Sequence, residues 1–237
     1  MFPLRAVHKP LRAPLVTRLL IAINIVVFVA RFLPGIGGEW ARQLFVHGGV
    51  VSHCYLAPEA CGIQSSTRIE DLAKPLLVSL FLHEGAFHLA FNMLFLSVFG
   101  SGVEEKLGKL KFSIFYFTCG IGATFAQIAT HPFSDDILIG ASGAIAGILG
   151  AYFVLLPKSW ILTYFPPIFL FPLPAPVFLL LWILAQIAAQ FSTGWNRVLD
   201  GVSEPTSVAW MAHIGGFACG ALWAWRMKPW WKGAKPK

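Results

Sequence analysis

Two residues with the chemistry of a nucleophile and a base lie in separate apolar runs of this sequence. Ser142 lies in the segment Gly140-Ala141-Ser142-Gly143, just before the apolar residues 144–156, and His213 lies within the apolar residues 208–225. A serine in an apolar helix means little by itself, because its hydroxyl can bond to a carbonyl one turn earlier. A histidine in a membrane span is costly and by default marks function. We therefore take Ser142 and His213 as a candidate nucleophile and general base.

A second polar pair could stabilise the anion that such a nucleophile creates. His88 and Asn92 are four residues apart, which places both on one face of a helix. Each side chain can donate a hydrogen bond. The first backbone N–H groups of a helix that begins at Ser142 would also be free, because the first turn lacks internal acceptors. Together these groups could form an oxyanion hole, in which each donor is worth about 10²–10³ in rate.

The composition indicates which kind of scaffold must position these residues. The chain has 237 residues, of which 57% are hydrophobic and 12% are charged. A soluble domain carries about 25% charged residues, so the surplus of apolar residues points to a lipid environment. The length suits one compact unit. We expect an all-α polytopic membrane protein with a single domain over 1–237: a cytoplasmic tail at 1–14, a membrane core at 15–226 and a basic cytoplasmic tail at 227–237.

Hydrophobic runs of membrane-spanning length predict six transmembrane helices. They cover approximately residues 15–33, 78–100, 110–130, 140–157, 175–191 and 207–226. The first span is expected to remain in the chain, because it is long for a signal peptide and lacks a small-residue cleavage site. The fifth span is weakened by prolines and is expected to begin after Pro176. A five-span alternative would omit it. Trp182 and the proline-rich start make this span our candidate for a substrate gate.

The positive charges predict the orientation of the spans. Most Lys and Arg residues fall on one side of the six-span arrangement, at positions Arg5, Lys9, Arg12, Arg18, Lys106, Lys109, Lys111, Lys158, Arg226, Lys228, Lys232, Lys235 and Lys237. The positive-inside rule then places both termini in the cytoplasm, and we expect a bacterial inner membrane. The net charge of +7 follows the membrane flanks rather than a stripe interleaved with aromatic residues, so no nucleic-acid partner is predicted. In this orientation, spans two, four and six bring their polar residues to the outer third of the bilayer.

Small residues predict how two of these spans meet. Gly143 and Gly147 on span four, and Gly216 and Gly220 on span six, form small-xxx-small steps that allow close backbone approach. Only such an approach lets a short serine side chain reach an imidazole on another helix. The alternative is that these glycines serve packing alone. The polar residues Asn24, Gln127, Gln186 and Gln190 are interpreted as forming interhelical hydrogen bonds.

The four cysteines fall into two groups. Cys54 and Cys61 lie in the outer loop between spans one and two, where an oxidising compartment could join them. The sequence leaves the bonded and free states equally open. Cys119 and Cys219 lie in spans and are interpreted as packing residues.

His83, Glu84 and His88 suggest a zinc-dependent protease as a rival chemistry. Such proteases place two histidines four residues apart on a helix, about 40° apart around its axis. Here the separation is five residues, or about 140°, so both cannot bind one ion from a regular helix. His83 is instead interpreted as a structural or interfacial hydrogen-bonding residue, and Glu84 as a solvated residue at the rim.

Four segments in order resemble the rhomboid family of intramembrane serine proteases. They are residues 83–93 on span two, 103–108 just after it, 140–143 on span four and 212–216 on span six. The resemblance covers about residues 75–226. It implies a six-transmembrane-helix bundle, a Ser142–His213 dyad, and an oxyanion hole from His88, Asn92 and the backbone N–H of Ser142. It also implies single-span membrane proteins as substrates, cut near the outer end of their span, and no metal or organic cofactor.

Two positions depart from the family pattern. Family members commonly carry a Trp-Arg pair ahead of the first histidine of the span-two motif, where this chain has Lys74 and Pro75. Many also place an aromatic residue four positions after the nucleophile, under the catalytic histidine, where this chain has Ala146. We expect the outer loop and the ring of His213 to be held by other residues.

A non-proteolytic membrane protein is the alternative from a different functional class. It would be a rhomboid-like pseudoenzyme that escorts membrane spans, or a small transporter. Pseudoenzymes of this architecture generally lack the serine or the histidine, and both are present here. Transporters often show paired broken helices in repeats, and the proline-rich approach to span five has no counterpart in the other half of the chain.

Overall fold

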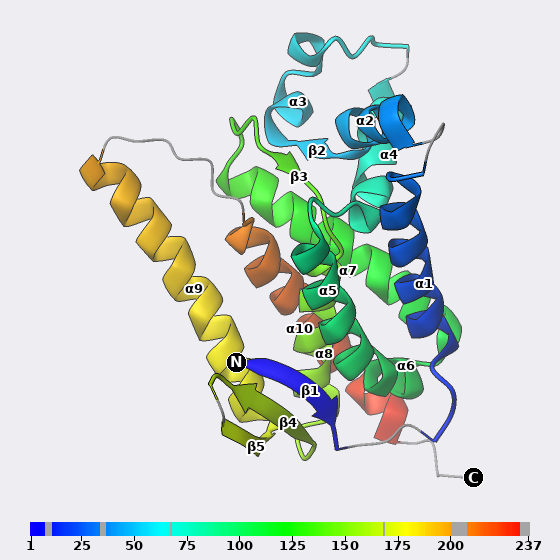
Figure 1. The fold of residues 1–237 in the computed structure, drawn as a ribbon, viewed down its shortest axis with the longest axis vertical. Helices are drawn as coiled ribbons and strands as arrows, with labels where there is room; N and C mark the ends of the chain where they lie inside the picture. The colour runs from blue at the N-terminus through cyan, green and yellow to red at the C-terminus, as the bar shows by residue number, and fades with distance from the viewer. Residues whose placement is uncertain (8–10, 34–36, 67, 168, 201–207, 233–237) are drawn as a thin grey trace.

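The computed structural model contains ten α-helices within the residues that it describes, which are all of 1–237 except 8–10, 34–36, 67, 168, 201–207 and 233–237 (Figure 1). The helices are α1 (Leu15–Ala30), α2 (Gly37–Gly48), α3 (Ser52–Leu56), α4 (Arg68–Val78), α5 (Ala86–Phe95), α6 (Ser101–Leu107), α7 (Lys109–Thr130), α8 (Ser142–Leu155), α9 (Ala175–Asp200) and α10 (Trp210–Lys232). A helix therefore lies in each of the six predicted spans. Three stretches are long and apolar enough to cross a membrane: Ala86–Leu107, Lys109–Thr130 and Ala175–Ser192. Leu15–Ala30 and Ser142–Leu155 are shorter apolar helices.

The second span differs from its predicted range of 78–100. The chain before Ala86 is a 3₁₀ turn followed by an extended segment, and Gly85 has extended backbone angles (φ −143°, ψ 167°). The helix then runs through a π-helical segment, Leu96–Gly100, into α6. This continuous helix includes Glu104, which lies beyond the end of the predicted span at residue 100. The Glu104 carboxylate accepts hydrogen bonds from the backbone N–H groups of Val16 (3.0 Å) and Thr17 (2.8 Å). These N–H groups begin α1, where the helix dipole favours an anion.

The expectation of an all-α chain is incomplete, because two small sheets flank the helices. β1 (Phe2–Ala6), β4 (Trp160–Phe165) and β5 (Phe169–Pro174) form an antiparallel sheet in the order β1-β4-β5, and β2 (Val50–Val51) pairs with β3 (Ile137–Leu138). The predicted tail at 1–14 thus contains a paired strand. The predicted tail at 227–237 begins inside α10, which continues to Lys232.

The start of α9 agrees with the predicted range of 175–191 but precedes Pro176, after which the helix was expected to begin. The helix begins at Ala175, so Pro176 occupies its first turn rather than preceding it. A proline fits there because its missing N–H would have no partner in the first turn. The helix includes one of the three membrane-length stretches, which disfavours the five-span alternative. Figure 1 shows α9 leaning away from the other helices toward its C-terminal end.

The core lies where α5, α6, α7 and α8 meet. Phe99, Phe112, Phe115, Tyr116 and Tyr152 are fully buried there, and the rings of Phe99 and Tyr152 meet edge to face at 5.1 Å between centroids. The outer loop and helices α2 to α4 gather at one end of the bundle, and the β1-β4-β5 sheet lies toward the other (Figure 1). The packed core thus fixes the second half of α8, which carries Tyr152, against the first half of α7.

Candidate active site

One cavity brings together all four residues that the sequence singled out. It has a volume of about 890 Å³, and its lining includes His88, Asn92, Ser142 and His213. These residues come from α5, α8 and α10, which are distant in sequence. Gln127 and Gln186 also line the cavity, as do Glu84 and Asp135 at exposed positions.

The backbone before α8 places Ser142 at a helix N-terminus. Gly140 has a φ of +120°, which side-chain-bearing residues rarely adopt, and a Cβ there would lie 2.8 Å from His88 Nε2. The N–H of Gly140 donates to the carbonyl of Ser79 (2.9 Å). Glycine at this position therefore allows the turn and leaves room for His88. Because α8 begins at Ser142, the N–H groups of its first turn lack helical acceptors.

Asn92 presents a hydrogen-bond donor that the fold leaves without an acceptor. Its side chain is 6% exposed, and its Nδ2 atom has no acceptor among the described residues. A buried amide group without a partner costs about 1–3 kcal/mol, so it calls for an explanation. A ligand atom bound in the cavity would satisfy it. His88 lies one turn earlier on the same helix and lines the same cavity.

His213 is held by a hydrogen bond that assigns its tautomer. Its Nδ1 atom lies 2.7 Å from Oε1 of Gln186 on α9. A carbonyl oxygen only accepts, so Nδ1 carries the proton and Nε2 keeps its lone pair. A neutral imidazole in this form presents Nε2 as a base.

The aromatic support expected for the ring of His213 comes from two tryptophans. The ring centroids of Trp182 and Trp210 each lie 6.0 Å from that of His213, and Trp210 meets it edge to face. Trp182 is one turn before Gln186 on α9, so the same face of this helix supplies a ring contact and a hydrogen bond. These contacts take the place of the aromatic residue that many family members have at the position of Ala146.

The predicted close packing of spans four and six is confirmed. A Cβ at Gly216 would lie 2.2 Å from the carbonyl oxygen of Gly143, and a Cβ at Gly220 would lie 1.9 Å from that of Gly147. Both contacts are with backbone atoms, which cannot move aside as a flexible side chain could. α8 and α10 therefore touch backbone to backbone next to the cavity.

Gln127 is an interhelical hydrogen-bonding residue, as predicted. Its Oε1 atom accepts a hydrogen bond from the backbone N–H of Ala212 (3.2 Å). This N–H belongs to the first turn of α10 and has no acceptor within the helix. The bond fixes the start of α10 against α7, directly beside His213.

The segment before α5 is anchored by a residue that the sequence analysis did not single out. Arg31 donates to the carbonyls of His83 (2.9 Å) and Glu84 (3.1 Å), and its guanidinium lies over three phenylalanine rings. The outer loop has a further tie. Burial raises the pKa of Tyr55 to about 12, so its hydroxyl stays protonated and donates to the carbonyl of Leu72 (2.6 Å). These bonds anchor the outer loop in place of the Trp-Arg pair, which is replaced in this chain by Lys74 and Pro75.

The structure does not support the hypothesis that His83 and His88 belong to the zinc site of a protease. Among the described residues, no group of three metal-ligating side chains includes His83 or His88. The buried ring of His83 packs edge-on against that of His88, with 5.0 Å between centroids. Glu84 is exposed at the rim of the cavity, as expected.

Gln186 was predicted only to form an interhelical hydrogen bond, and its partner His213 was not predicted. Its position four residues after Trp182 was the available signal, because that spacing places both side chains on one helix face. The missing information was the position of α9 relative to α10.

Comparison with known proteins identifies the family to which this geometry corresponds. The family model of the Rhomboid domain matches residues 72–230. The rhomboid protease AarA of Providencia stuartii is 34% identical over 164 residues, covering 61% of this chain and 52% of that protein. Rhomboid protein 1, mitochondrial, of Saccharomyces cerevisiae is 30% identical over 151 residues, covering 62% and 40%. The human presenilin-associated rhomboid-like protein, mitochondrial, is 31% identical over 156 residues, covering 64% and 37%.

The coverage and the sources of these relatives limit what they say. The chain spans about half or less of the length of each. One relative is bacterial and two are named mitochondrial. They therefore support an integral membrane protein, and they do not support the bacterial inner membrane that the sequence analysis expected.

Proposed function

Because the chain belongs to the rhomboid family, we propose that it is an intramembrane serine endopeptidase. It cleaves single-span membrane proteins near the outer end of their transmembrane segment, through a dyad of Ser142 and His213. The observation that carries the proposal is the shared cavity, whose lining includes a serine at a helix N-terminus, a histidine bonded through Nδ1 to Gln186, and Asn92, whose buried Nδ2 has no acceptor among the described residues.

The proposed mechanism begins with proton transfer to His213. Nε2 of His213 accepts the proton of the Ser142 hydroxyl as Oγ attacks the carbonyl carbon of the scissile peptide. The carbonyl oxygen becomes an oxyanion, which accepts hydrogen bonds from the backbone N–H of Ser142 and the side chains of His88 and Asn92. His213 then gives its proton to the leaving amine, and an acyl ester forms on Ser142. A water molecule, deprotonated by His213, hydrolyses this ester and regenerates the serine.

Only protein groups and water take part in this sequence, so it needs no cofactor. Water reaches the acyl ester through the cavity, whose rim carries the exposed side chains of Glu84 and Asp135. The partners are a transmembrane substrate and the lipid bilayer. A substrate span enters beside α9, which leans away from the bundle (Figure 1) and carries Trp182 and Gln186 at the cavity.

The test is direct cleavage of a single-span substrate in liposomes. The full chain should cut such a protein within the outer third of its span, and mass spectrometry of the products gives the bond. Cleavage only in the soluble part of the substrate, or none across a panel of single-span proteins, would contradict the proposal.

We propose that the chain crosses the membrane six times with both termini in the cytoplasm. The even number of spans and the positive flanking charges support this arrangement, as does the position of the start of α1 and the end of α10 at one end of the bundle (Figure 1). A cysteine introduced at Lys74 should react with an impermeant maleimide in intact cells, whereas one at Lys158 should react only after permeabilisation. Labelling of Lys158→Cys in intact cells would contradict this orientation and indicate the opposite one.

Removing the Asn92 amide should slow the chemical step. We expect Asn92→Ala to lower kcat by about 10²–10³ with little change in KM, because the donor stabilises the oxyanion rather than the bound substrate. The melting temperature should not fall through loss of a hydrogen bond, because Nδ2 has no acceptor to lose within the described residues. Ser97→Ala, at an exposed position further along the same continuous helix, is the control. An unchanged kcat would show that Asn92 is not part of the oxyanion hole.

Removing the acceptor on α9 should weaken the base. We expect Gln186→Leu to lower kcat about fivefold, because one hydrogen bond worth about 1 kcal/mol fixes the tautomer and direction of His213. KM should change little if substrate binding is unaffected. Gln190→Leu, one turn further along α9 and outside the cavity lining, is the matched control. Equal effects of the two substitutions would indicate a general perturbation of α9.

A further inference from the structure

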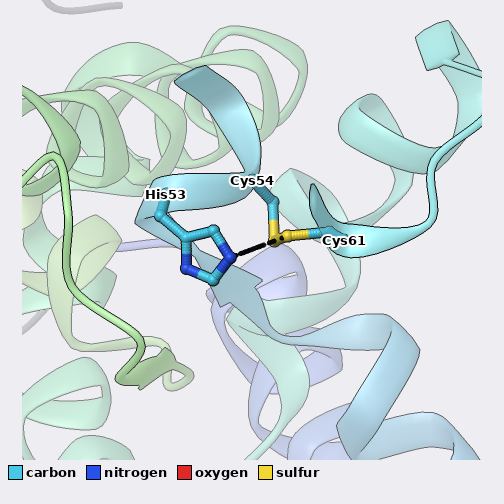
Figure 2. Close-up of side chains that lie close together, drawn as sticks. All are labelled: His53, Cys54 and Cys61. Atoms are coloured by element: carbon cyan, nitrogen blue, oxygen red, sulfur yellow. Dashed lines mark hydrogen bonds between the residues drawn. A yellow bond between two sulfur atoms is a disulfide. The ribbon is translucent and has the colours of Figure 1, made fainter. Parts of the chain in front are cut away.

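A second chemically active cluster lies in the outer loop, beside Asp135 at the rim of the cavity. Figure 2 shows His53, Cys54 and Cys61 with the imidazole facing the two sulfurs. Cys54 and Cys61 form a disulfide, which resolves the alternative that the sequence left open. His53 Nε2 lies 3.0 Å from Cys61 Sγ and 3.8 Å from Cys54 Sγ.

The other ring nitrogen of His53 lies beside a carboxylate. His53 Nδ1 pairs with Asp135 Oδ1, which comes from the loop between α7 and α8. A disulfide sulfur has no hydrogen to donate, so in the oxidised chain Nε2 carries a proton and donates it to Cys61 Sγ. Once the disulfide is reduced and Nε2 loses this proton, the ring has the arrangement of a metal-binding histidine, with a carboxylate beside one nitrogen and the other nitrogen able to coordinate.

The positions of the three ligand atoms suit a small thiophilic cation. Nε2 of His53 and the sulfurs of Cys54 and Cys61 all lie within 4.8 Å of one another, and all three residues are half-buried. In a tetrahedral zinc site, bonds of about 2.0–2.3 Å separate the ligand atoms by about 3.3–3.8 Å. Opening the disulfide would move the sulfurs apart into this range, while the imidazole already faces them.

We propose that, once the disulfide is reduced, His53, Cys54 and Cys61 bind one zinc ion, with Asp135 as the residue that orients His53. A dithiol reductant supplies two electrons and two protons to the disulfide and is itself oxidised to a disulfide. The two thiols released then lose their protons as the metal binds. The fourth position is left to water. The disulfide and the zinc ion would thus each link Cys54 to Cys61, and only one of them can be present at a time. Neither link requires proteolytic activity.

The experiment compares oxidised and reduced forms of the full chain in detergent. After reduction with dithiothreitol and its removal under nitrogen, zinc is titrated in competition with a chromophoric chelator, and bound metal is counted by mass spectrometry. Reduced wild type should bind about one more zinc per chain than the oxidised form. His53→Ala and Cys61→Ser should lose this ion. Asp135→Asn should keep the stoichiometry but bind about 10–100-fold more weakly.

Two further measurements guard against misfolding and adventitious binding. His47→Ala, which removes an exposed histidine on α2, should leave zinc binding unchanged. Cobalt(II) added to the reduced chain should give the charge-transfer absorption of a thiolate complex, which weak binding by surface histidines does not produce. Equal zinc binding by oxidised and reduced chains, or retention of the ion in a folded His53→Ala variant, would overturn the proposal. So would the absence of the cobalt–thiolate band.

Discussion

Ser142→Ala should abolish both peptide cleavage and covalent labelling by a fluorophosphonate or an isocoumarin. The substitution removes the only atom that forms the acyl bond, so kcat should fall by about 10⁶-fold, to the background of the assay. The change is small and leaves the backbone N–H of residue 142 in place, so the fold should persist. Gel fluorescence of the labelled chain in detergent measures the first effect, and cleavage in liposomes measures the second.

Ser113→Ala is the matched control, because that serine lies half-buried on α7 outside the cavity lining and donates to the carbonyl of Lys109. It should label and cleave as the wild type does. Absence of labelling from the wild type would favour the non-proteolytic alternatives, a pseudoenzyme that escorts membrane spans or a transporter. Labelling that persists in Ser142→Ala would place the nucleophile elsewhere.

The helical frame was predictable because hydrophobicity and small residues act locally. Each apolar run of membrane-spanning length became a helix, and the steps of Gly143 with Gly147 and Gly216 with Gly220 marked the two helices whose backbones touch. Polar residues that are costly in a membrane then pointed to the cavity. All four candidate residues line it because each lies on a helix whose position depends on these strong signals.

The pairings of β1 with β4 and of β2 with β3 were missed because they are non-local. β1 pairs with β4 across more than 150 residues, with Phe2 opposite Tyr164. Prolines in this region predicted only a break in the helix. In fact Pro3, Pro172 and Pro174 lie in the two edge strands, where a missing N–H is tolerated, and the central strand β4 has no proline.

The partners of His213 were missed for a different reason. The presence of Ala146 showed that the aromatic residue common under the ring of His213 is absent, but it did not show which residues replace it. Trp182 and Gln186 fill that role from α9, whose position depends on tertiary packing rather than on its own sequence. A similar limit applied to Arg31, which reaches the carbonyls of His83 and Glu84 more than 50 residues away.

His213→Ala should reduce cleavage about as strongly as loss of the serine, by about 10⁶-fold, because Ser142 then has no group to accept its proton. The wild type should carry a pH signature of the same group. His213 acts as a base only while its ring is neutral, so activity should fall on acidification through the pKa of the imidazole and hold at mildly alkaline pH. Initial rates of cleavage in liposomes from pH 5 to 9 measure the profile, with unfolding followed separately at each pH.

The acid limb should belong to His213 and not to the general stability of the protein. His47→Ala removes an exposed histidine outside the cavity lining and should retain both the rate and the profile. The Gln186→Leu variant should keep an acid limb with a lower plateau, because the imidazole still titrates but is no longer directed by its acceptor. A flat profile from pH 5 to 9 in the wild type, or substantial cleavage by His213→Ala, would contradict the role of His213 as the base. The dyad would then have to be replaced by a mechanism in which another group in the cavity activates Ser142.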